Sequence, residues 1–214
     1  MTPPVALRVA EFDPRCGVLG PGVRAVVWVQ GCPLRCPGCI TPEYLPSNGG
    51  TVIPVDIVAE QITSLPDIDG VTFSGGEPFA QADPLAELVD LIRADRDLSV
   101  MAYSGFTLDH LRRRGDDGQR RLLDRLDILV DGPYLRARHG AIRWRGSTNQ
   151  TLHVLTDRHR DLIGEPDVPA GMEITVRQEG VIDLVGVPPV ADSHTAFFAQ
   201  LAEAGIRFDQ EEQR

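Results

Sequence analysis

Residues 24–39 read RAVVWVQGCPLRCPGC, in which an apolar run leads directly into three cysteines. The β-branched and aromatic residues of the run, 24–30, are typical of a buried strand. We therefore predict that 24–30 forms the first strand of the fold and that the cysteine loop lies at its carboxyl end. Proteins with alternating strands and helices build their sites at that end, so the loop is the first candidate for function.

Apolar periodicity beyond the loop predicts strands that alternate with helices. Pro54 opens a helix with apolar residues along one face, and Pro66 ends it. Asp83 and Pro84 cap a second helix of the same kind. The remaining predicted strands are 70–73, 98–103, 126–130, 151–155, 173–177 and 181–185, and the remaining predicted helices are 107–113, 119–125 and one that begins at Asp192 or Ser193 and ends at Gly205.

This alternation predicts an α/β fold whose strands are mostly parallel. About six such units with right-handed crossovers would form a partial, incomplete (β/α) barrel, although a flat doubly wound sheet also fits the pattern. The 214 residues can bury one substantial core but are too few for two large domains. We expect a single core domain over 1–208 and a frayed tail over 209–214.

The composition restricts the possible partners. The 21 basic and 31 acidic residues give a net charge of −10, whereas a protein that binds duplex nucleic acid needs a basic surface. No apolar run approaches the roughly 18 residues of a membrane span, and the first ten residues do not resemble a secretory signal. We expect a cytoplasmic protein that binds neither a membrane nor duplex nucleic acid.

Three of the four cysteines, Cys32, Cys36 and Cys39, lie so close together that they are better metal ligands than disulfide partners in a reducing compartment. Thiolates favour zinc, copper(I) or iron–sulfur clusters. Structural zinc would need a fourth ligand at short spacing, and the nearest histidine is the distant His110. A cluster with four protein ligands would recruit Cys16, whereas a [4Fe–4S] cluster on three cysteines would leave one iron open.

A second motif, Ser74-Gly75-Gly76-Glu77-Pro78, follows the predicted strand 70–73. The two motifs in this order resemble the radical S-adenosylmethionine (SAM) enzymes. The resemblance implies a [4Fe–4S] cluster on the three cysteines, SAM on the open iron, and cleavage of SAM to a 5′-deoxyadenosyl radical. It also implies that Gly75 and Gly76 let the main chain approach SAM, that Glu77 fixes the turn or accepts from the SAM ammonium, and that Pro78 completes this cofactor-binding turn.

Further stretches in the region 15–155 resemble one branch of that family, the activating enzymes of anaerobic ribonucleotide reductase. The resemblance implies that Tyr103 and Ser104 lie near the SAM ribose and that Gly186 lies in a late strand against adenine. It also implies that Asp131 and the turn 146–150 line the mouth where a loop of the partner enters. The stretches that carry it are Gly20-Pro21-Gly22, the cysteine loop, Gly-Gly-Glu-Pro with Gln81, Tyr103-Ser104-Gly105-Phe106-Thr107, Val130-Asp131-Gly132-Pro133-Tyr134 and Arg145-Gly146-Ser147-Thr148-Asn149-Gln150.

By this resemblance the chain is an enzyme that generates a glycyl radical on the large subunit of an anaerobic ribonucleotide reductase after reduction by a flavodoxin-like protein. Such a reaction needs positioning and exclusion of water more than proton transfer, so we predict no catalytic acid or base. The alternatives are a radical SAM enzyme that acts on a small molecule or peptide and a non-catalytic iron–sulfur electron carrier. The polar insertion at 157–170, the final helix and Gly38, where many such loops carry an aromatic residue, depart from the branch.

Overall fold

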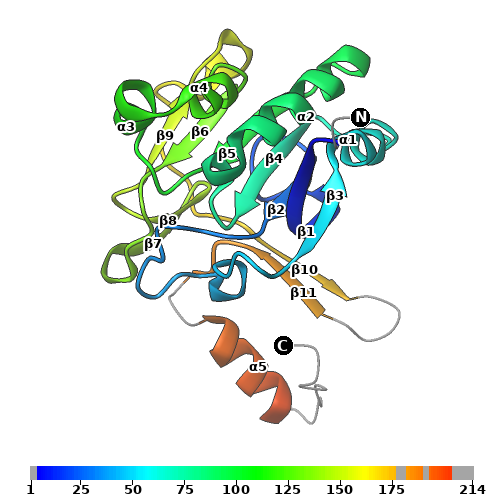
Figure 1. Cartoon of the computed structure of the whole chain (residues 1–214). Coiled ribbons are helices and arrows are strands. Elements are labelled where there is room, and N and C mark those ends of the chain that lie inside the picture. The colour runs from blue at the N-terminus through cyan, green and yellow to red at the C-terminus, as the bar shows by residue number, and fades with distance from the viewer. Residues whose placement is uncertain (1–3, 177–181, 190–192, 204–214) are drawn as a thin grey trace.

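A computed structural model of the chain describes residues 4–176, 182–189 and 193–203. Its centre is a seven-stranded sheet in the order β3-β1-β2-β4-β5-β6-β9 (Figure 1). The bounds are Thr51–Pro54 for β3, Ala6–Cys16 for β1, Arg24–Val29 for β2, Gly70–Gly75 for β4, Ser99–Tyr103 for β5, Ile128–Asp131 for β6 and Thr151–Val154 for β9. Two separate hairpins pair β7 (His139–Ile142) with β8 (Arg145–Ser147) and β10 (Met172–Val176) with β11 (Ile182–Gly186).

Most strands of the large sheet point in one direction. The central strands β2, β4, β5 and β6 are parallel to their neighbours within this group. Strand β1 is antiparallel to both β2 and β3, so β3 runs with the central group, and β9 is antiparallel to β6. The sheet ends at β3 and β9, which do not pair with each other, and the barrel is therefore incomplete.

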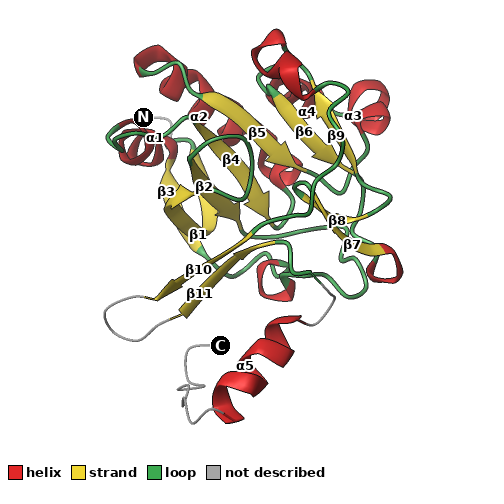
Figure 2. Ribbon diagram, turned by 180° about the vertical axis from the view of Figure 1, so that it is seen from behind, coloured by secondary structure: helices red, strands yellow, loops and turns green. Residues whose placement is uncertain are grey.

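The helices of the barrel cover one face of the sheet (Figures 1 and 2). On β2, Ala25, Val27 and Val29 pack in the core that the helices share, whereas Val26 and Trp28 pack in a second cluster on the opposite face. A doubly wound sheet would need helices on both faces, so this alternative is wrong. The helices are α1 (Val55–Thr63), α2 (Ala82–Asp95), α3 (Leu108–Arg114), α4 (Asp117–Leu123) and α5 (Ser193–Glu203), with short 3-10 turns η1 (Pro42–Tyr44), η2 (Pro78–Gln81), η3 (Arg136–Arg138) and η4 (Asp157–Leu162).

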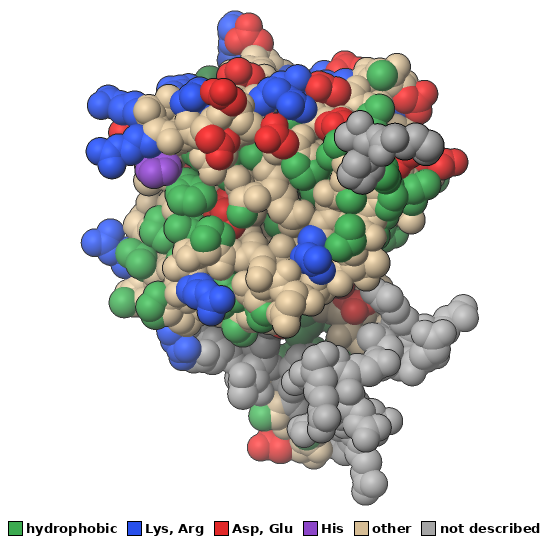
Figure 3. Space-filling model, in the orientation of Figure 1, with side chains coloured by type: hydrophobic (Ala, Val, Ile, Leu, Met, Phe, Trp, Pro, Cys, Tyr) green, Lys and Arg blue, Asp and Glu red, His purple; other side chains and the backbone are tan. Residues whose placement is uncertain are grey.

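Helix α2 shows how the sequence builds this core. Its residues Leu85, Leu88, Val89 and Ile92 recur at helical spacing and are all fully buried. Burying each such side chain contributes about 1.5–3 kcal/mol before the loss of conformational entropy is counted. On the solvent side, Arg121 of α4 and Arg125 just after it form ion pairs with Asp83 and Asp90 of α2. Figure 3 shows acidic and basic side chains interspersed over this region. No described helix has the length and hydrophobicity of a membrane span.

The predicted elements are largely confirmed, with three corrections. Strands β1, β3, β7 and β8 were not predicted, and because of β1 the strand before the cysteines is the second in the chain and not the first. Only three crossovers join parallel strands in the described residues, through α1, through α2 and through α3 with α4, not about six. Helix α2 begins at Ala82 after Gln81, so Asp83 lies in its first turn and is not its cap. The predicted positions Arg177, Val181, Asp192, Gly205 and 209–214 lie outside the described residues.

A buried arginine ties the amino-terminal ends of β2, β4 and β5 together. The Arg24 side chain is fully buried and donates to the hydroxyl of Thr72 at 2.7 Å and to the carbonyl oxygen of Val71 at 2.7 Å. It also donates to the carbonyl oxygen of Ser99 at 3.0 Å and to that of Pro21 at 3.1 Å. Burial lowers the pKa of Arg24 to about 10, which keeps the guanidinium charged at neutral pH.

Replacing this arginine by a side chain of similar length without donors tests its role. We expect Arg24→Met to lower the free energy of unfolding by about 2–4 kcal/mol, because several buried oxygens lose their donors together. Arg114→Met, at an exposed position of α3, should change it by less than about 0.5 kcal/mol. Chemical denaturation measures both, and equal stability of Arg24→Met and the unmodified chain would contradict the role assigned to Arg24.

Candidate functional site

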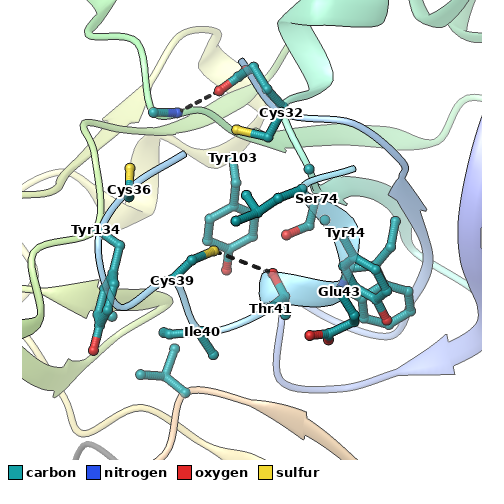
Figure 4. Close-up of a pocket in the computed structure, with 18 of the residues that line it drawn as sticks. Cys32, Cys36, Cys39, Ile40, Thr41, Glu43, Tyr44, Ser74, Tyr103 and Tyr134 are labelled. Atoms are coloured by element: carbon teal, nitrogen blue, oxygen red, sulfur yellow. Dashed lines mark hydrogen bonds between the residues drawn. The ribbon is translucent and has the colours of Figure 1, made fainter. Parts of the chain in front are cut away.

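A cavity of about 560 Å³ opens at the carboxyl ends of β2, β4 and β5 (Figure 4). Figure 4 shows Cys32, Cys36 and Cys39 among the side chains that line the pocket, together with Ser74 of β4 and Tyr103 of β5. Parallel strands place their carboxyl ends at one rim, so segments that follow different strands meet there. The size is that of a pocket for a small molecule or cofactor.

Main-chain hydrogen bonds hold the cysteine loop against the short helix η1. The amide of Gly31 donates to the carbonyl oxygen of Tyr44 at 2.8 Å, and that of Cys32 donates to Leu45 at 3.1 Å. Within the loop, the amide of Cys39 donates to the carbonyl oxygen of Cys36 at 3.2 Å. The loop is therefore anchored at its start and folded back on itself at its end.

The three cysteines of the loop line the same cavity. In residues 4–176, 182–189 and 193–203, no three His, Cys, Asp or Glu side chains approach closely enough to bind one metal ion. Partial burial and the neighbouring thiols of Cys32 and Cys39 raise the pKa of Cys36, while a hydrogen bond from the Tyr134 main chain lowers it. In a [4Fe–4S] cluster each thiolate binds a different iron, so three half-buried soft donors around one cavity fit such a cluster.

The turn after β4 lies directly against the cysteine loop. Gly75 has a φ of +93°, a conformation that other residues rarely adopt. A Cβ on Gly76 would lie 2.3 Å from the carbonyl oxygen of Gly31, closer than any real contact allows. The amide of Glu77 donates to that same oxygen at 2.9 Å. Two consecutive glycines therefore let the main chains of the two motifs touch.

The Glu77 carboxylate connects the turn after β4 to the turn after β5. It is 1% exposed and accepts from the amide of Phe79 at 3.0 Å, the hydroxyl of Ser104 at 2.9 Å and the amide of Gly105 at 2.8 Å. Burial raises the pKa of Glu77 to about 7, and the three donors lower it in part. Of the two roles predicted for Glu77, the structure shows the one that fixes the turn.

Tyr103 adds a polar group that has no partner in the described part of the chain. It lines the cavity and packs against the two buried clusters that contain Trp28 and Met101, and its hydroxyl is buried without a hydrogen bond to any described residue. Burial raises the pKa of Tyr103, so the hydroxyl stays protonated and can donate. Buried hydroxyls are normally satisfied, so this one is available to a bound molecule.

The cavity brings together most of the predicted site residues but leaves out Pro78, Asp131 and the middle of the predicted turn, residues 147–149. Pro78 is buried at the start of η2 and does not line the cavity. Asp131 was predicted at the mouth, but its buried carboxylate accepts from the amide of Leu108 and lies 3.1 Å from Nε2 of His153, where it fastens α3 to the sheet. Those that line the cavity are Cys32, Cys36, Cys39, Gly75, Gly76, Glu77, Tyr103, Ser104, Gly146, Gln150 and Gly186.

Cys16 lies apart from the other cysteines. Its side chain is fully buried with Leu19, Val26 and Trp28, and it does not line the cavity. Burial raises the pKa of the Cys16 thiol to about 11, so it stays protonated at neutral pH. Both observations count against Cys16 as a fourth cluster ligand and thus against the electron-carrier alternative.

Part of the cavity wall was not predicted. Glu11 of β1 and Tyr44 of η1 line it, and the Tyr44 hydroxyl donates to the Glu11 carboxylate. The whole of β11 forms another part of the wall. Strand β1 could have been found from the alternation of buried Leu7 and Val9 with Arg8. The family resemblance predicted Gly186 of β11 at the cofactor site, whereas the lining by the other residues of this strand was not predicted.

The chain matches one protein family and resembles several known proteins. A family model described as a 4Fe–4S single cluster domain matches residues 18–153, which include the cysteine loop and both turns. The anaerobic ribonucleoside-triphosphate reductase-activating protein of Vibrio cholerae is 31% identical over 154 residues, which cover 68% of this chain and 97% of that protein. The pyruvate formate-lyase-activating enzyme of Listeria monocytogenes is 36% identical over 92 residues, 41% of this chain and 37% of that enzyme. The crystal structure of QueE from Escherichia coli has a TM-score of 0.36 and 17% identity, over 48% of this chain and 53% of that one.

The raised pKa of Glu77 predicts a specific dependence of stability on pH. A carboxyl that titrates near 7 when folded and near about 4.3 when unfolded holds its proton more tightly in the folded chain. Stability should therefore fall as the pH rises through this interval, by up to about 3 kcal/mol. In Glu77→Gln the free energy of unfolding should decrease less between pH 5 and pH 7.5 than in the unmodified chain. Chemical denaturation at the two pH values would measure the difference.

The control for this measurement is Glu60→Gln, at an exposed position of α1. Its pH profile should run parallel to that of the unmodified chain. If the Glu77→Gln profile were also parallel, Glu77 would not titrate in this range.

Proposed function

The chain belongs to the radical SAM activating enzymes within the 4Fe–4S single cluster domain family, and from this membership we propose that it generates a glycyl radical on an anaerobic ribonucleotide reductase. The match to activating proteins over nearly their whole length is the observation that carries the proposal. An external low-potential protein such as a flavodoxin would supply the electron. We also propose that residues 1–208 form a single core domain.

The cysteine loop is proposed to hold the [4Fe–4S] cluster. Cys32, Cys36 and Cys39 would each give one thiolate and leave one iron open for SAM. When bound, the reduced cluster supplies the electron that splits SAM into methionine and a 5′-deoxyadenosyl radical, which abstracts hydrogen from a glycine of the partner.

The other residues around the cavity would position SAM and exclude water. Gly75 and Gly76 leave the main chain bare next to the loop, which suits close approach by the methionine part of SAM. Tyr103 offers a hydroxyl that no residue of the described ranges hydrogen-bonds, and Gly186 of β11 adds a surface without a side chain. Trp28 and Leu19 make the inner wall apolar, which favours a dry site for radical chemistry.

Substitution of each cysteine tests the ligand set. After anaerobic reconstitution, we expect Cys32→Ala, Cys36→Ala and Cys39→Ala to retain little iron and sulfide, because two thiolates cannot hold the cluster. Cys16→Ala is the matched control and should retain as much of both as the unmodified chain. Loss of the cluster in Cys16→Ala would instead support a cluster with four protein ligands.

Adding SAM to the reduced protein tests the reaction. We expect the electron paramagnetic resonance signal of the reduced cluster to change when SAM is added, because SAM would chelate the open iron. Dithionite should then drive release of 5′-deoxyadenosine, measured by chromatography. An unchanged signal together with no 5′-deoxyadenosine would rule out the proposed chemistry.

The acceptor of the radical is tested separately. With anaerobic ribonucleotide reductase present, a glycyl radical doublet should appear on the reductase and increase with the amount of SAM cleaved. Release of 5′-deoxyadenosine without that doublet would favour a small molecule or peptide as the hydrogen donor.

A further inference from the structure

A second cavity, also of about 560 Å³, surrounds the free edge of β9. Strand β9 is the last of the seven-stranded sheet and pairs only with β6 within that sheet. Leu108 and Arg112 of α3 line this cavity from the helical face of the sheet, whereas Leu162 lines it from the opposite face. The cavity is therefore a groove that exposes the strand edge between two walls, and we refer to it as the β9 groove.

The main chain of β9 offers unpaired hydrogen-bonding groups in this groove. The amide of Leu155 donates to the carbonyl oxygen of Asp127 at 2.8 Å, which places His153 and Thr151 among the residues that bond to β6. The N–H and C=O groups of the alternate residues Leu152 and Val154 consequently point away from β6. Within the described residues, no hydrogen bond satisfies them. Such an edge can accept another extended chain.

The outer wall of the β9 groove is fixed in place. Arg143 forms an ion pair with Glu165 at 2.7 Å, and Arg145 forms one with Asp167. These pairs fasten the segment 163–167 to the hairpin of β7 and β8. The groove is thus a built feature of the insertion at 157–170, which otherwise had no assigned role.

The side chains of the groove indicate what it can bind. Ile163 is 66% exposed, among the most exposed large apolar side chains described, and Leu155 and Leu162 extend the apolar lining. Arg112 is exposed and has no carboxylate within ion-pair distance in the described part of the chain. A fitting occupant is an extended peptide that combines apolar residues with an acidic residue.

The β9 groove leads to the first cavity. Thr151, at the start of β9, lines the groove, and its neighbour Gln150 lines the first cavity. Likewise, Arg145 lines the groove and its neighbour Gly146 lines the first cavity. Thr151 also pairs with Asp131 at the carboxyl end of β6, so this end of the groove lies at the rim where the cysteine loop lies. A chain bound along β9 would continue into the cavity.

We propose that the β9 groove binds an extended segment of the partner protein, which adds a strand to β9 and directs the following residues into the first cavity. The inference rests on the proposed function, because the partner is the reductase whose glycine receives the radical. Main-chain hydrogen bonds to Leu152 and Val154 supply affinity, and contacts with Ile163 and Arg112 supply selectivity.

Two exposed substitutions test the groove without touching the first cavity. Ile163→Asp and Arg112→Glu should each weaken binding of purified anaerobic ribonucleotide reductase from the same genome by about tenfold or more, measured by calorimetry. They should lower the glycyl radical yield and leave dithionite-driven release of 5′-deoxyadenosine, measured without reductase, unchanged.

Two matched controls accompany them. Val52→Asp changes a side chain that is 55% exposed on β3, the opposite edge of the sheet, and Arg114→Glu changes an exposed arginine of α3 outside the groove. Both should bind the reductase as the unmodified chain does.

Each of three distinguishable results would overturn the inference. If the groove variants bound the reductase within about twofold of the unmodified chain, the groove would not be the docking site. If the unmodified chain did not bind the reductase at all, the proposed partner would be wrong and the inference would fall with it. If ultracentrifugation showed a dimer that Ile163→Asp converts to a monomer, the groove would hold a second copy of this chain.

Discussion

The parallel pairing of β2, β4 and β5 is the constraint on which the site depends. Parallel strands present their carboxyl ends at one rim, so the cysteine loop, the Gly75–Gly76 turn and the Tyr103–Ser104 turn meet although they are far apart in sequence. Two buried charged groups support this pairing from opposite ends. Arg24 joins the three strands at their amino ends, and Glu77 joins the turns at their carboxyl ends. Among the described residues neither group forms an ion pair, and the hydrogen bonds that hold each one come from strands or turns that only the folded barrel brings together.

The sequence predicted the helices and strands whose apolar residues recur at a regular spacing. Helix α2 and the strands β4 and β5 have strong apolar periodicity, and they were found within a few residues of their bounds. Strand β1 was missed because it is antiparallel and only half buried, so its apolar signal is weaker. The crossover count was wrong because the later strands look alike in sequence, whether they extend the parallel sheet as another unit or form a separate hairpin as β10 and β11 do.

The candidate site, too, was predictable from the sequence only in part. Short motifs identified the cysteines and the two glycines, since these residues act through spacing and backbone conformation that the sequence displays directly. The contacts of Asp131 could not be predicted, because its partners His153 and Leu108 come from other elements and only the folded chain brings them together. The edge of β9 also escaped prediction, since which strand ends a sheet is a property of topology.

The place of β11 in the cavity has a consequence for how such a protein can diversify. The cysteine loop and the turns beside it fall within residues 18–153, the part that the family model covers, whereas β11 lies beyond it. The wall that carries the proposed chemistry and the wall that faces it thus belong to separate stretches of the gene. Mutation, insertion or replacement of the later stretch can reshape the chamber while the earlier stretch keeps its composition. One pocket is thus built from two stretches of the chain, one inside the range that the family model matches and one outside it.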